Sequence, residues 1–144
     1  MSREPNSEFT VLVLAPTGRN AEAATALLSR DGIAARPCAS IPQLCELLQA
    51  PVGAVLIEEE AIASPRGRQE LSASLGEQPP WSDLPFIILT RNTFPARREL
   101  PAMRLPEALG NVMFLERPIH AFTLTNAVHT ALRARRRQYQ VIGR

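Results

Sequence analysis

The hydrophobic residues of this chain fall into short continuous runs, separated by segments in which apolar residues recur at helical spacing. The runs lie at residues 9–15 (FTVLVLA), 33–38, 54–57 (AVLI), 84–90 (LPFIILT) and 112–115 (VMFL). Most of them are rich in β-branched residues and show no alternation, which is typical of strands buried on both faces. The run at 33–38 is shorter and partly polar, as an edge strand tends to be. We therefore predict five strands in a parallel sheet covered by helices.

The segments between the runs predict the helices. Regular spacing indicates helices over residues 20–30, from 41 or 42 to 49, and 119–140, and Ser40 is expected to cap the second of them. A helix over 64–75 is weakened by glycine and serine, and one over 96–109 is interrupted by two prolines. The buried side of the last helix is predicted to be Leu124, Val128, Ala131 and Leu132, and to stop at Arg133.

Strands that alternate with helices predict an α/β fold with right-handed crossovers. Five such units in this length fit a flavodoxin-like doubly wound five-stranded parallel sheet, with strand order 2-1-3-4-5, in a single domain. The expected organisation is a flexible N-terminus at 1–8, a domain at 9–132, and a basic helical extension or linker at 133–144.

Composition narrows the class of protein. At 144 residues and 45% hydrophobic content, the chain can bury the core of one domain. It has no apolar run of about 18 residues and no leader pattern, so we expect a cytoplasmic protein with no membrane partner. Cys38 and Cys45 are expected to be buried free thiols, and His120 and His129 to be surface or partly packed residues, because neither pair has the neighbours or spacing of a metal site.

Charge is distributed unevenly. All sixteen Lys or Arg positions are arginine. Residues 1–132 contain eleven of these arginines and all fourteen acidic residues, whereas residues 133–144 contain five arginines and no acidic residue. A basic run of this kind is usually a solvated helix face. A nucleic-acid-binding module built on the Arg133–Arg137 cluster is the alternative, but nucleic acid is the less favoured partner because few aromatic residues are interleaved with the arginines.

Three carboxylates, Glu58, Glu59 and Glu60, follow the central run directly. In doubly wound sheets ligands bind beyond the carboxyl ends of the strands. These carboxylates therefore lie where a functional site is expected.

The order VLVLAP, AVLIE, PFIILT and VMFLERP, each followed by a helix, resembles the receiver domain of bacterial two-component systems over residues 9–138. In that family a pair of acids follows the first strand, and the phosphoaccepting Asp ends the third. A Thr or Ser ends the fourth strand, and a Lys before a Pro ends the fifth. The resemblance places Thr90 and Pro118 at matching positions.

The other positions depart from the receiver pattern. Ala15 and Pro16 stand where the magnesium-holding acids should be, Glu58 replaces the acceptor Asp, and Arg117 replaces the Lys. Mg²⁺ prefers carboxylate oxygens in octahedral geometry, so we expect no Mg²⁺ and no other cofactor. Glu also carries its carboxylate one methylene further than Asp, and a misplacement of about 1 Å can cost about 100-fold in rate.

The resemblance implies a degenerate response-regulator receiver that is not an enzyme and acts by protein contact. Three readings of the carboxylates stay open: a solvated acidic turn, a fixed pair between Glu58 or Glu59 and Arg117, and a functional receiver phosphorylated on Glu58 or Glu59. The ending RRRQYQ also resembles the passage from a receiver-like domain into the signalling helix of a sensor histidine kinase. We expect histidine kinase domains as partners, in cis or in trans, and a homodimer through the last helix or the surface around the fourth and fifth strands. The expected interaction residues are Leu124, Val128, Leu132, Arg136 and Tyr139.

Overall fold

The computed structural model describes residues 10–15, 20–77, 83–90, 111–116 and 120–143. Its five strands are β1 (Val11–Leu14), β2 (Ala35–Cys38), β3 (Ala54–Glu58), β4 (Pro85–Thr90) and β5 (Asn111–Glu116). The helices are α1 (Asn20–Arg30), α2 (Ile41–Leu47), the 3-10 helix η2 (Glu59–Ile62), α3 (Pro65–Leu75) and α5 (Ala121–Gly143). All five predicted strands are present, whereas the predicted helix over 96–109 lies outside the described residues.

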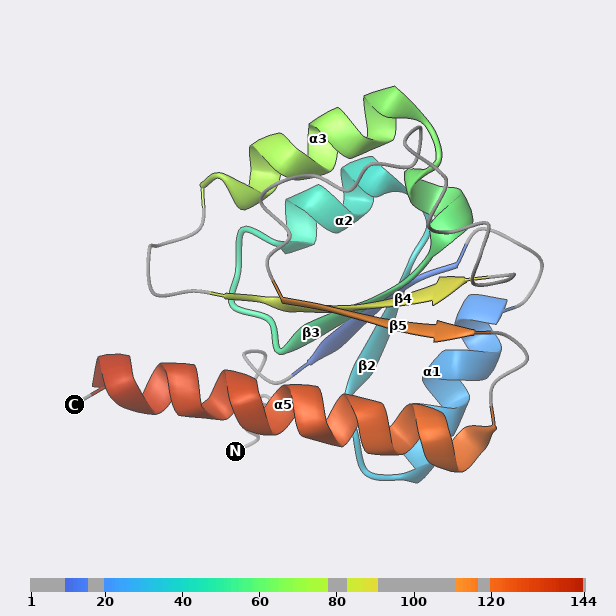
Figure 1. Cartoon of the computed structure of the whole chain (residues 1–144), viewed down its shortest axis with the longest axis vertical. Helices are drawn as coiled ribbons and strands as arrows, with labels where there is room; N and C mark the ends of the chain where they lie inside the picture. The colour runs from blue at the N-terminus through green and yellow to red at the C-terminus, as the bar shows by residue number, and fades with distance from the viewer. Residues whose placement is uncertain (1–9, 16–19, 78–82, 91–110, 117–119, 144) are drawn as a thin grey trace, which may run out of the picture.

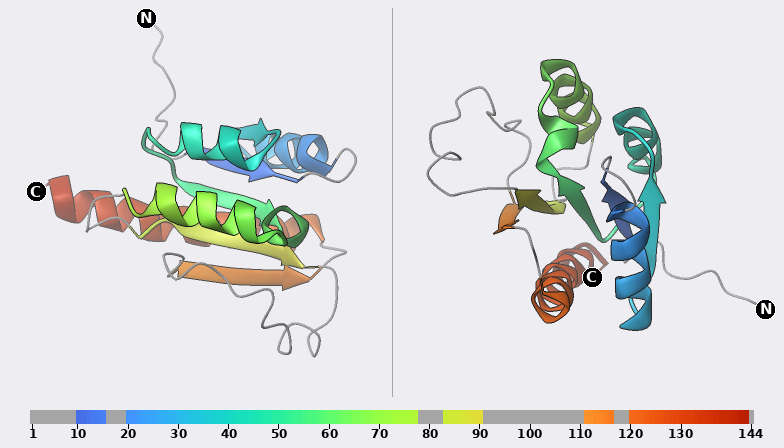
Figure 2. Two further views of the ribbon diagram at one scale, coloured as in Figure 1. Left: turned by 90° about the horizontal axis from the view of Figure 1, so that it is seen from above. Right: turned by 90° about the vertical axis from the view of Figure 1, so that its right-hand side faces the viewer.

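The strands form one parallel sheet in the order β2-β1-β3-β4-β5, as predicted. Helices α2 and α3 cover one face, and α1 and α5 cover the other (Figures 1 and 2). Alternate residues of each central strand point into two separate cores: Leu12, Val55 and Phe86 face α2 and α3, while Val13, Leu56 and Ile87 face α1 and α5. This double coverage explains why the central strands read as unbroken apolar runs.

Local interactions explain where the helices begin and end. Ser40 Oγ accepts a hydrogen bond from the Gln43 backbone N–H, so the predicted cap of α2 is confirmed. After α1 the chain reverses at Gly32, whose φ of 80° favours glycine. The N–H of Ile33 then donates to the Leu28 carbonyl, which keeps Ile33 out of β2. For this reason β2 begins at Ala35 rather than at residue 33.

Helix α3 forms although its sequence contains glycine and serine. Ser64 caps its first turn by accepting a hydrogen bond from the Gly67 N–H at 3.0 Å. A Cβ on Gly67 would lie 3.2 Å from Ser64 Oγ and 3.3 Å from the Ala61 carbonyl oxygen. The glycine therefore permits the close approach that the cap requires, which offsets its low helix propensity.

The buried side of α5 extends further than predicted. Leu124, Val128, Ala131 and Leu132 are buried as expected, but Arg135 is also buried, with 2% of its surface exposed. The prediction that the buried side stops at Arg133 is therefore wrong. Among the described helices, none combines the length and the apolar character that crossing a membrane requires.

Candidate functional site

The carboxyl ends of the parallel strands all lie at the same end of the sheet, which the arrowheads mark in Figure 1. We call this end the carboxyl edge. Ala15 follows β1, Glu58 ends β3 and Thr90 ends β4. Because Glu58 pairs with Leu89 in the parallel register, Thr90 lies one position beyond Glu58 on the neighbouring strand. The structure thus brings Ala15, Glu58 and Thr90 to one edge, as the sequence predicted.

Glu58 is enclosed by the protein. It belongs to β3 itself and has 0% of its surface exposed, whereas Glu59 and Glu60 are half-buried in the 3-10 helix η2. The reading of this stretch as a solvated acidic turn is therefore wrong for Glu58. β3 continues one residue past the apolar run, so the backbone of Glu58 belongs to the sheet.

The remaining positions of the predicted site divide into two groups. Ala15 and Thr90 are both buried, with 8% and 2% of their surfaces exposed. Ala15 offers no side-chain oxygen where a magnesium ligand would stand. Pro16, Arg117 and Pro118 lie outside the described residues, so the pair between Glu58 or Glu59 and Arg117 stays a prediction. Within the described ranges, no three His, Cys, Asp or Glu side chains gather closely enough to hold a metal ion.

At the opposite end of the sheet, Arg135 joins α5 to the segments that precede two strands. Its Nε donates to the Val52 carbonyl oxygen at 3.0 Å, and its two terminal nitrogens donate to Gln138 Oε1 at 2.8 Å and to the Tyr139 hydroxyl at 3.2 Å. The Tyr139 ring lies 4.9 Å from the guanidinium carbon. Gln138 in turn exchanges two hydrogen bonds with the backbone of Asp83, just before β4. We call Arg135, Gln138 and Tyr139 the α5 anchor.

Sequence reasoning missed the α5 anchor, although a pattern for it was present. Arg135 lies seven residues after Val128 and three after Leu132, so it continues the buried stripe at helical spacing. Its burial also divides the predicted arginine cluster, because Arg133, Arg136 and Arg137 are exposed while Arg135 is not.

The residues predicted to form a dimer contact also include both buried and exposed side chains. Leu124, Val128 and Leu132 pack in the core beneath the sheet, so the chain itself covers these side chains. Of the other two, Arg136 is exposed, whereas Tyr139 is half-buried beside Arg135. A contact through α5 would therefore use its outer side.

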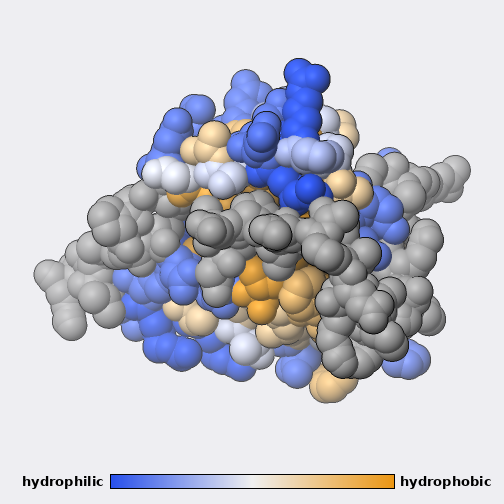
Figure 3. All heavy atoms as spheres, turned by 45° about the horizontal axis from the view of Figure 1, so that its top comes forward, coloured by the Kyte–Doolittle hydropathy of each residue, from blue (hydrophilic) through white to orange (hydrophobic). Residues whose placement is uncertain are grey.

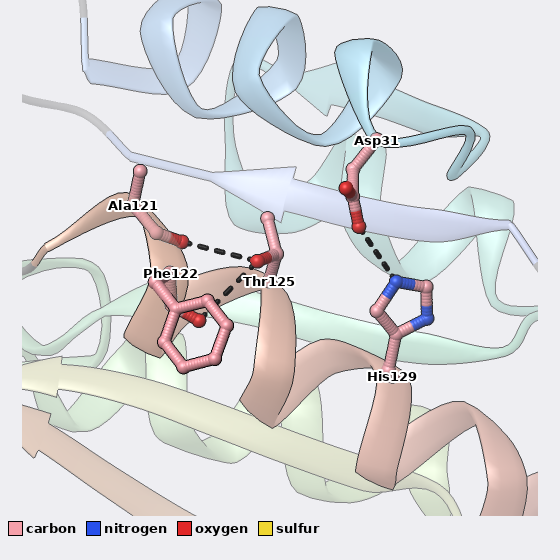
Figure 4. A network of polar contacts seen from close by, with 5 residues as sticks. All are labelled: Asp31, Ala121, Phe122, Thr125 and His129. Atoms are coloured by element: carbon pink, nitrogen blue, oxygen red, sulfur yellow. Dashed lines mark hydrogen bonds and ion pairs between the residues drawn. The ribbon is translucent and has the colours of Figure 1, made fainter.

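The first half of α5 is also joined to α1 (Figure 4). His129 Nε2 lies 2.6 Å from Asp31 Oδ2, just after the end of α1, and both side chains are about half exposed. One turn earlier, the Thr125 hydroxyl donates to the carbonyls of Ala121 and Phe122. The partly packed position predicted for His129 is confirmed, and an exposed pair of this kind adds little stability.

Neither cysteine takes part in a disulfide. Cys38 is buried, as predicted, whereas Cys45 is half-buried. Burial raises the pKa of the Cys38 thiol to about 11, although the positive charge of Arg36 lowers it in part. Burial likewise raises the pKa of Cys45. Both thiols are therefore protonated at neutral pH, which is the state of a structural cysteine and not of a nucleophile.

The sheet order and the two helix layers together define a receiver-like fold. Solved structures with this fold include the CheY-like response regulator receiver domain protein from Methanospirillum hungatei JF-1. It has a TM-score of 0.68 and 13% identity over 90% of this chain and 98% of that one. A sensor protein from Polaromonas sp. JS666 is similar, with a TM-score of 0.66 and 19% identity over 91% of this chain and 99% of that one.

NtrX from Brucella abortus, solved in complex with ADP, has a TM-score of 0.70 and 18% identity. That match covers 93% of this chain but only 28% of the NtrX chain. No protein-family model and no curated protein matches the sequence. At these identities the comparisons show the fold, which confirms the receiver-like, flavodoxin-like architecture predicted from the sequence.

Proposed function

We propose that this chain is a degenerate receiver domain that acts in two-component signal transduction by protein contact, without phosphoacceptor chemistry. The observation that carries the proposal is the complete burial of Glu58 at the position where receivers hold their acceptor Asp. The receiver-like fold supports the signalling role, and the residues around Glu58 support the loss of chemistry.

Phosphoryl transfer needs an accessible acceptor oxygen and stabilisation of charge on the transferring group. The carboxylate of Glu58 has no exposed surface through which a phosphodonor could approach, and Ala15 supplies no oxygen for a metal. Mg²⁺ demands near-ideal octahedral oxygen coordination, which the described residues at this edge do not fit. We therefore propose that the domain works without Mg²⁺ and without catalysis.

The loss of phosphorylation can be tested by incubating the protein with Mg²⁺ and acetyl phosphate and measuring its intact mass. We expect an unmodified mass under conditions in which a receiver with the full set of acids gains a phosphoryl group. An adduct that maps to Glu58 or Glu59, and that disappears in a Glu58→Gln or Glu59→Gln variant, would contradict the proposal and support a functional receiver.

For the partner surface, we propose the outer side of α5 together with β5, used in a homodimer or against a histidine kinase domain in cis or in trans. Phe122, in the first turn of α5, is 77% exposed, and Phe114, in the edge strand β5, is 41% exposed. Because Phe114 pairs with Ile88, it lies on the α2/α3 face of the sheet, so the proposed surface passes around the β5 edge. Figure 3 shows apolar atoms reaching the surface on the side of the molecule where β5 forms the edge of the sheet. Exposed aromatic side chains of this size are enriched in protein interfaces.

The Phe122→Glu variant tests this surface. If Phe122 packs against a second copy, sedimentation velocity should show a dimer for the parent protein and a shift toward monomer for the variant, because a buried unpaired charge opposes association. Thr123→Glu is the matched control, since Thr123 is an exposed neighbour on the same helix. A monomeric parent protein, or an equal effect of both variants, would argue against a homodimer through this surface.

A further inference from the structure

A cavity of about 320 Å³ opens at the amino ends of β1 and β2, at the end of the sheet opposite Glu58. Its lining includes Thr10, Leu12, Arg36, Leu47, Pro51 and Val52. We call it the amino-end cavity. Its volume lies at the lower end of the range for small-molecule sites, which are also mostly apolar with a few polar groups.

The walls of the amino-end cavity are set by the sheet and by the end of α2. The Thr10 carbonyl accepts a hydrogen bond from the Gly53 N–H at 2.8 Å, and the Ala34 carbonyl accepts one from the Val11 N–H at 2.9 Å. These backbone groups are therefore already bonded, and they hold the wall in place. The lining residues are mostly apolar, and Leu47, Ala50 and Pro51 are more exposed than Leu12 and Val52, which keep only 2% and 4% of their surfaces exposed.

Arg36 gives this apolar cavity a positive charge. Because Arg36 pairs with Leu12 in the parallel register, the two side chains lie on the same face of the sheet as the cavity. In the part of the chain that the structure describes, Arg36 has no salt-bridge partner. An anionic group would supply one, and the hydroxyl of Thr10 in the same lining adds a second hydrogen-bond donor.

We propose that the amino-end cavity binds a small amphipathic carboxylate, with an aliphatic body against the apolar lining around Leu47, Ala50 and Pro51 and its carboxylate against Arg36. Apolar walls favour the body of such a ligand by removing its surface from water. The guanidinium of Arg36 would favour the acid over a neutral molecule of the same length.

A ligand in this cavity would contact the residue that holds the α5 anchor. Val52 belongs to the cavity lining, and its carbonyl oxygen accepts the hydrogen bond from Arg135. Binding there would therefore restrict Val52 and, with it, the second half of α5.

The test is a titration of the full chain with octanoate, followed by amide chemical shifts in NMR. Octan-1-ol and inorganic phosphate serve as probes for the apolar body and the charge alone. We expect saturable shifts for octanoate at residues 10–12, 34–36 and 47–52. Weaker binding is expected for octan-1-ol, and none for phosphate.

Two variants with the same change of charge test the role of Arg36. Arg36→Gln should weaken octanoate binding by about threefold, since the pair is partly solvated, and leave octan-1-ol binding unchanged. Arg66→Gln, which alters an exposed arginine at the start of α3, should bind octanoate like the parent protein. The proposal is overturned if octanoate does not saturate, if its shifts centre on Phe114 and Phe122, or if octan-1-ol binds as tightly as octanoate.

Discussion

Replacing Arg135 with alanine is expected to lower the free energy of unfolding by about 3 kcal/mol. The side chain is 2% exposed and donates hydrogen bonds to Val52, Gln138 and Tyr139. Its removal leaves the carbonyl oxygen of the buried Val52 without its donor and takes one donor from the half-buried Tyr139 hydroxyl. Urea unfolding followed by circular dichroism measures the change.

Two further variants separate the role of the α5 anchor from a general effect of charge. Arg137→Ala removes an exposed arginine two residues further along α5 and should change stability by less than about 0.5 kcal/mol. Arg135→Lys keeps the charge but not the planar fork, so it should restore only part of the loss. Equal stabilities for Arg135→Ala and Arg137→Ala would show that the buried arginine is not an anchor.

The Leu124→Ala variant is also expected to lose about 3 kcal/mol of stability. Leu124 is 6% exposed and packs with Val128 and Ile87 in the core between α5 and the sheet, so truncation leaves a cavity inside the chain. Because this loss arises within one chain, the difference from the parent protein should be the same at every protein concentration. Urea unfolding at two concentrations, tenfold apart, provides the measurement.

This second measurement decides between a core role and an interface role for Leu124. If Leu124 were a dimer contact, the loss would appear only where the parent protein is dimeric, and so would grow with protein concentration. The control is Thr123→Ala, which truncates an exposed side chain at the neighbouring position and should stay within about 0.5 kcal/mol of the parent protein.

The sheet could be predicted from the sequence because its strands are buried on both faces. A strand such as β4, in which every residue from Pro85 to Thr90 is buried, can hold almost nothing but apolar residues, so its sequence and its position in the fold agree closely. The ends of the elements were less predictable. The start of β2 depends on the hydrogen bond from Ile33 to Leu28, and α3 depends on the contact between Gly67 and Ser64.

The buried polar residues could not be predicted in the same way. Glu58 and Arg135 look like surface residues by type, since an isolated charge is costly to bury. Arg135 is buried because Val52, Gln138 and Tyr139 meet around it, and Val52 is far from it in the sequence. The position of Glu58 at the carboxyl end of β3 could be predicted, but its burial could not, because burial depends on contacts between segments that are distant in the sequence.

The two attachments of α5 have a mechanical consequence. With 23 residues the helix is about 35 Å long. The core packs against its first half through Leu124, Val128 and Leu132. Arg135, three residues after Leu132, attaches the next part of the helix to Val52. The section from residue 124 to residue 135, about three helical turns, is therefore held to the sheet, and this restricts tilting of the helix there. A displacement of the helix would have to move this whole section relative to the sheet, or break the hydrogen bond from Arg135 to Val52.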